Sequence, residues 1–141
     1  MRPLRTRRAW RLAMAAPLLV SGASACHASD EDVIEAGRAD FERHCAVCHG
    51  LDGTGSGPLA EYLIRKPSDL TVIAQSYAGT FPVDRVAAVI DGRADVAAHG
   101  PREMPVWGYR FSETPDRAEG TRSAEERITA ITSYLETLQK R

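Results

Sequence analysis

Residues 37–49, with the sequence GRADFERHCAVCH, decide the fold of this chain. Gly37, Phe41 and Cys45 recur at every fourth position, and residues spaced this way lie on one face of a helix. A helix is expected from Asp30 to about Val47, with acidic residues in its first turn. The segment therefore predicts an amphipathic helix whose C-terminal end carries the chemistry described next.

The end of this helix holds a Cys-x-x-Cys-His motif. Cys45 and Cys48 lie at i and i+3, so both thiols face the same way, and His49 follows directly. This signature is typical of c-type haem attachment, in which each thiol bonds the macrocycle and the histidine binds iron. A zinc site would need further ligands at structural spacing, and a dithiol redox pair would need a βαβ context. The motif favours one covalent haem c.

The second axial ligand of the iron decides the function. Met104 is the candidate, because the other methionines, Met1 and Met14, lie in the N-terminal segment. It precedes Pro105 in a segment rich in glycine and proline, outside any helical stripe, and methionine is a known axial ligand of haem iron. The rival is His99, which would give a bis-histidine iron with a lower reduction potential.

The first 25 residues are expected to be a secretory signal peptide. They contain five arginines and no acidic residue, and the apolar stretch Leu12–Val20 is followed by Ala23-Ser24-Ala25, a cleavage site of the A-x-A type. Cleavage after Ala28 is the alternative. The remainder, 26–141, is expected to form a single cytochrome domain in the bacterial periplasm. Cys26 would then be the first residue, where a lipid anchor is the less favoured alternative to a soluble protein.

The charge of this remainder limits its partners. Of the 18 basic residues 5 lie in the first 25, which leaves 13 against 19 acidic residues, so the exported part is about 6 units negative. Nucleic acids and anionic lipid surfaces are bound by basic patches, so neither is expected as a partner. The charge favours a redox partner protein with a basic docking face. Such encounters are expected to be transient, and the protein itself is expected to be a monomer.

Five further segments have recognisable patterns, and no run of alternating strand residues is found. Ser123-Ala124-Glu125-Glu126 has the form of a capping box, and apolar residues at helical spacing follow it. The other expectations are a short helical turn in Leu59–Ile64, a helix over Pro82–Asp91, a loop from Gly92 to Phe111 and a polar connection from Ser112 to Arg122.

These features together resemble class I c-type cytochromes. In that family a small and an aromatic residue of the first helix, here Gly37 and Phe41, cross the C-terminal helix, whose facing residues here would be Ile131, Tyr134 and Leu135. The resemblance implies an all-α cytochrome c fold, with three to four helices around one covalently bound haem and crossing terminal helices.

The resemblance extends to two loops. The Gly-x-Gly-Pro-Leu stretch ending at Leu59 is similar to the family loop in which a proline carbonyl, here that of Pro58, accepts a hydrogen bond from the proximal histidine. Met104-Pro105-Val106-Trp107-Gly108 is similar to the methionine loop, which implies a place for Trp107 in the haem environment. Weaker candidates for partners of the haem propionates are Arg65, Arg93 and Arg102, and His44 is expected at the surface.

The function implied is electron transfer without catalysis. A carrier with permanent His49 and Met104 ligands is the first hypothesis. A fixed monohaem subunit of a larger dehydrogenase or oxidase is one alternative. A haem peroxidase or gas-binding protein is the other, should Met104 leave the iron open.

Overall fold

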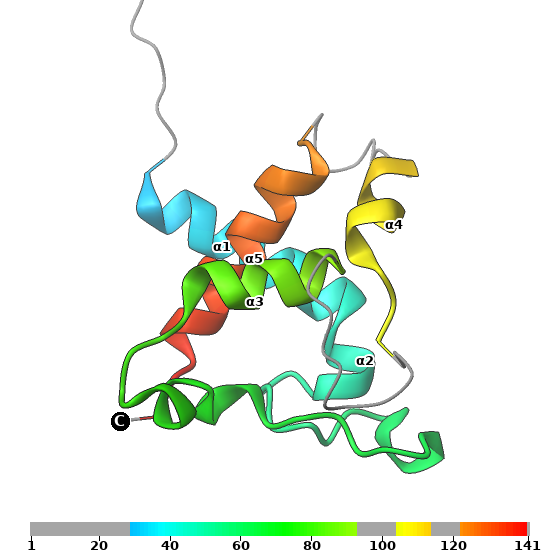
Figure 1. The fold of residues 1–141 in the computed structure, drawn as a ribbon. Coiled ribbons are helices and arrows are strands. Elements are labelled where there is room, and N and C mark those ends of the chain that lie inside the picture. The colour runs from blue at the N-terminus through cyan, green and yellow to red at the C-terminus, as the bar shows by residue number, and fades with distance from the viewer. Residues whose placement is uncertain (1–28, 93–103, 114–121, 141) are drawn as a thin grey trace, which may run out of the picture.

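The computed structural model describes residues 29–92, 104–113 and 122–140, and within these ranges it contains helices and no strand (Figure 1). The all-α fold class is therefore confirmed. In chain order the elements are α1 (Asp30–His44), α2 (Ala46–His49), the 3-10 helices η1 (Ala60–Tyr62), η2 (Leu70–Val72) and η3 (Ala74–Tyr77), then α3 (Val83–Asp91), α4 (Trp107–Glu113) and α5 (Ala124–Thr137).

Capping boxes start both terminal helices. At α1 the Ser29 hydroxyl accepts from the Asp32 amide at 3.2 Å, and the Asp32 carboxylate accepts from the Ser29 amide at 3.0 Å. Ser123 and Glu126 make the same exchange at α5, with distances of 3.2 and 2.6 Å. Each box satisfies amide groups that have no partner within the helix.

α1 and α5 cross in direct backbone contact at the centre of Figure 1. A Cβ atom placed on Gly37 would lie 1.9 Å from the Ala130 carbonyl oxygen, so only glycine permits this approach. One turn further along, the rings of Phe41 and Tyr134 pack with centroids 5.4 Å apart. Ile131 and Leu135 are buried beside them. The expected crossing of the terminal helices is confirmed.

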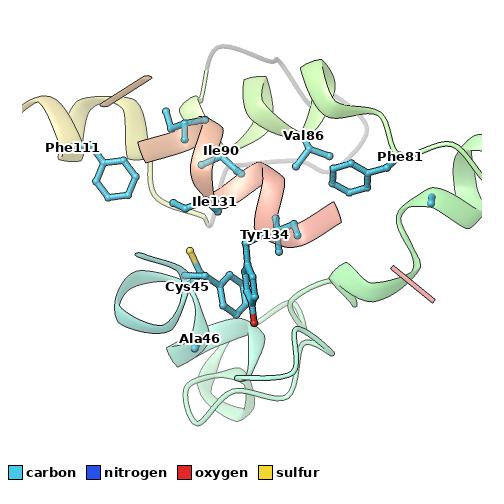
Figure 2. Close-up of a cluster of buried hydrophobic side chains, with 12 residues drawn as sticks. Cys45, Ala46, Phe81, Val86, Ile90, Phe111, Ile131 and Tyr134 are labelled. Carbon is cyan, nitrogen blue, oxygen red and sulfur yellow. The ribbon is translucent and has the colours of Figure 1, made fainter. Parts of the chain in front are cut away.

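The core extends from this crossing to α3 and α4. Figure 2 shows the side chains of Phe81, Val86, Ile90 and Phe111 directed toward α5. The segment after α5 returns to the 3-10 helices, where the Gln139 side chain donates to the Leu70 carbonyl at 2.8 Å and accepts from the Ala74 amide at 3.0 Å. The chain end is thereby fixed beside η2 and η3.

Two expected boundaries differ from the structure. The first helix ends at His44, and Cys45, with φ −110° and ψ −37°, separates it from α2. The predicted loop from Gly92 to Phe111 is wrong over its last residues, and the predicted connection from Ser112 to Arg122 over its first two, because α4 spans Trp107–Glu113. Trp107 and Phe111 lie one turn apart with ring centroids at 5.3 Å, and this apolar face supports the helix.

The helices of the described ranges are too short or too polar for any of them to cross a lipid bilayer.

Candidate haem-binding site

The Cys-x-x-Cys-His motif occupies α2 and the residue before it. The Cys48 and His49 amides donate to the Cys45 carbonyl at 3.1 and 2.9 Å, so the two cysteines lie one helical turn apart. Both thiols are free of disulfide bonds; Cys45 is buried and Cys48 is half-buried. Figure 2 shows Cys45 next to Ala46 within the apolar cluster. The two are candidate attachment sites whose spacing suits adjacent vinyl groups.

Burial favours the neutral forms of Cys45 and His49. It raises the pKa of the Cys45 thiol to about 12, and the nearby Asp40 charge acts in the same direction. Burial also lowers the pKa of His49 below its usual value, against a smaller opposing effect of its hydrogen bond to Ser68. A neutral imidazole is the form that binds a metal ion.

A backbone carbonyl orients the His49 ring. Its Nδ1 lies 3.1 Å from the Ser68 carbonyl oxygen, which identifies Nδ1 as the protonated nitrogen. The Nε2 lone pair is then available to iron, and this type of bond fixes the tautomer and strengthens the ligand. The residues of α2 therefore fit a haem with a proximal histidine.

The predicted partner of this ring was the Pro58 carbonyl, and that prediction is wrong. Pro58 is exposed, and the carbonyl that reaches His49 belongs to Ser68. A Cβ on Gly55 would lie 2.3 Å from the Pro67 carbonyl oxygen, so this glycine lets the chain around Ser68 come close to the motif. Pro58 remains a predicted neighbour of the haem through its place in the same loop.

The loop containing Pro58 wraps the C-terminal end of α2. Its amides at Gly55, Gly57 and Leu59 donate to three carbonyls of α2 at 2.7 to 3.0 Å, which satisfies groups left open at the helix end. Beside it lies an open hollow of about 640 Å³ whose lining includes Pro58 and Ile64. Its lining is mixed, with the charged Glu61 and Lys66 beside Ile64, which is 96% exposed.

Some of the remaining predicted site residues lie within the described ranges and others lie outside them. Met104 is half-buried and packs with Trp107 against the apolar core. Arg65 is exposed. The rival ligand His99 lies outside the described residues, as do Cys26, Arg93 and Arg102. Across the described ranges, no three histidine, cysteine or acidic side chains gather as ligands of a metal ion.

A protein-family model described as cytochrome C oxidase, cbb3-type, subunit III matches residues 32–118. The chain belongs to this family of c-type cytochromes. The match includes the Cys-x-x-Cys-His motif and Met104, and it establishes a haem-based electron-transfer protein rather than a catalytic enzyme. The family's cofactor is a covalently bound haem c. No curated protein and no solved structure matches the chain.

The cytochrome also contains a buried polar cluster that the sequence did not reveal. Its members are Asp40, His44, Arg122 and Arg127. The prediction that His44 lies at the surface is wrong, because its ring is half-buried against the rings of Trp107 and Phe111. The available signal was a charge within an apolar face: Asp40 lies three residues after Gly37, and Arg127 lies four residues before Ile131.

Proposed function

We propose that this cytochrome is a one-electron carrier of the bacterial periplasm, with its haem attached at Cys45 and Cys48 and ligated by His49 and Met104. When bound, the haem supplies a ferric/ferrous couple. The observation that carries the proposal is the His49 ring, neutral, half-buried and held by the Ser68 carbonyl with Nε2 free to bind.

The role of Met104 is supported by its place in the chain. Two residues separate it from α4, and its side chain packs with the apolar core. It is the sole methionine downstream of the proposed signal peptide. Methionine donates weakly to ferric iron, so this ligand favours the ferrous state and raises the reduction potential. Two permanent ligands also leave little to rearrange when an electron moves.

The proposed compartment follows from the N-terminal segment. Its arginines, the apolar stretch Leu12–Val20 and the A-x-A site support export, with cleavage before Cys26. The acidic surface of the exported chain supports transient partners with a basic docking face, and such encounters weaken as salt screens the charges.

A test with carbon monoxide distinguishes the carrier from a gas-binding protein or peroxidase. The ferrous protein should keep its spectrum under carbon monoxide at neutral pH, because Met104 occupies the site that the gas needs. Prompt formation of a carbon monoxide adduct, together with turnover of peroxide, would replace the carrier proposal with the enzymatic one.

A second candidate is a fixed subunit of a terminal oxidase, which the description of the matching family favours. Purification distinguishes the two: a carrier is recovered alone from the periplasmic fraction, whereas a subunit is recovered from detergent-treated membranes with its partner chains.

A further inference from the structure

Asp40 is fully buried between α1 and α5, where two arginines bind its carboxylate. Arg127, 3% exposed, has its Nε 3.2 and 3.3 Å from the two carboxylate oxygens. The Nη2 of Arg122 lies 3.0 Å from Oδ2. Buried ion pairs are expensive to desolvate, and apolar residues of similar volume often stabilise a fold equally well. The stability of the α1–α5 contact therefore does not by itself explain these charges.

Arg127 extends from this pair to two other parts of the molecule. Its Nη2 donates to His44 Nε2 at 3.0 Å, so His44 is neutral and carries its proton on Nδ1. Its guanidinium lies over the Phe111 ring, with Cζ 4.0 Å from the ring centroid, which is cation–π geometry. One side chain of α5 thus contacts both the end of α1 and the buried face of α4.

His44 completes the connection to α4. Its ring centroid lies 5.5 Å from that of Trp107 and 5.4 Å from that of Phe111. In the chain it directly precedes Cys45, the first cysteine of the haem motif. The imidazole of His44 therefore contacts α4, and the backbone joins His44 directly to the attachment segment.

α4 is also held by α3. A Cβ on Gly108 would lie 2.8 Å from the backbone oxygen of Asp91, so the first turn of α4 lies against the C-terminal end of α3. Only Pro105 and Val106 separate this turn from Met104. The position of α4 consequently limits where the Met104 side chain can be.

From these contacts we propose that Asp40, Arg127 and His44, here called the Asp40 network, are positioning residues for Met104. The network fixes α4 relative to α1 and Cys45, and thereby keeps Met104 on the iron. This inference rests on the proposed His49 and Met104 ligation. Loosening the network should raise the fraction of molecules in which Met104 has left, without removing the haem or the helices.

The test compares Arg127→Lys and His44→Phe with the parent holoprotein. Lysine keeps the charge beside Asp40 but lacks the planar fork that reaches His44 and covers Phe111. Phenylalanine keeps a ring between α1 and α4 but cannot accept from Arg127. The readouts are the far-red charge-transfer band of the ferric Met-ligated haem and the affinity of the ferric haem for imidazole.

The expected result for Arg127→Lys is a weaker far-red band and about tenfold tighter imidazole binding. The apparent affinity for imidazole is proportional to the fraction of molecules in which Met104 has left the iron, so a tenfold rise in that fraction gives this change. His44→Phe should give about a threefold change, because it removes one hydrogen bond of ordinary strength. If Arg127→Lys does not fold, as judged by circular dichroism, His44→Phe decides the question.

Two controls separate positioning from general stability. Ser29→Ala removes the α1 cap far from the network and should lower the unfolding midpoint while leaving band and imidazole affinity unchanged. Arg38→Lys alters an exposed arginine of α1 paired with Glu35 at 2.8 Å, and should change neither readout.

The outcomes separate this inference from the ligation on which it rests. A parent with the far-red band, and folded network variants whose band and imidazole affinity match it, would overturn the network while the ligation stands. A parent without the band would overturn the ligation and the inference together.

Discussion

Gly37→Ala is expected to destabilise the protein by about 3 kcal/mol, as overpacking of a close contact does. Helix propensity alone predicts that Gly37→Ala stabilises the protein, since alanine in a helix interior is favoured over glycine by about 1 kcal/mol. The steric contact outweighs the helix propensity, because the new Cβ would lie 1.9 Å from the Ala130 carbonyl oxygen and the backbone of neither helix can move away without losing packing. Denaturant unfolding of the holoprotein measures the difference.

The matched control for this substitution is Thr129→Ala on α5. Thr129 directly precedes Ala130 but is exposed, so its truncation should change the free energy of unfolding by no more than about 0.5 kcal/mol. A Gly37→Ala protein as stable as the parent would show that α1 and α5 do not approach as closely as described.

Replacing both Cys45 and Cys48 by alanine is expected to abolish covalent haem. Haem staining of a denaturing gel should show no signal on the chain, and acidified organic solvent should extract any pigment that remains. Each thioether is formed by one thiol, so either single variant should retain haem through the other cysteine.

Cys26→Ser is the control for the double variant, because it removes the third cysteine and should leave the haem covalently bound. Haem that stays on the chain without Cys45 and Cys48 would contradict attachment at the motif. Loss of haem in Cys26→Ser would require a role for Cys26 that the motif does not include.

The sequence alone was sufficient to predict the helical frame. Periodic spacing and capping residues gave α1, α3 and α5 nearly to their bounds, because each of these helices buries one regular face and because α1 and α5 start at side-chain caps. The crossing at Gly37 was predictable through the family resemblance, since a small residue beside an aromatic one permits close helix approach. The Cys-x-x-Cys-His motif was equally direct, because its chemistry lies within five consecutive residues.

What the sequence did not predict depends on tertiary contacts. At the start of α4, Trp107 contacts the tilted ring of His44, a residue far away in the chain. The carbonyl that orients His49 belongs to Ser68, and a backbone group has no sequence signature. The Asp40–Arg127 pair joins positions 87 residues apart, and the charge of neither residue identifies its partner.

The most direct test of the central claim is the ferric absorption spectrum of Met104→Ala measured beside that of the parent. The parent should show the far-red charge-transfer band of a Met-ligated haem, and the variant should lack it and become high-spin or bind exogenous imidazole. The reduction potential should fall by on the order of 0.1 V or more, within the roughly 0.8 V that axial ligands span. A variant whose band and potential equal those of the parent would contradict ligation by Met104.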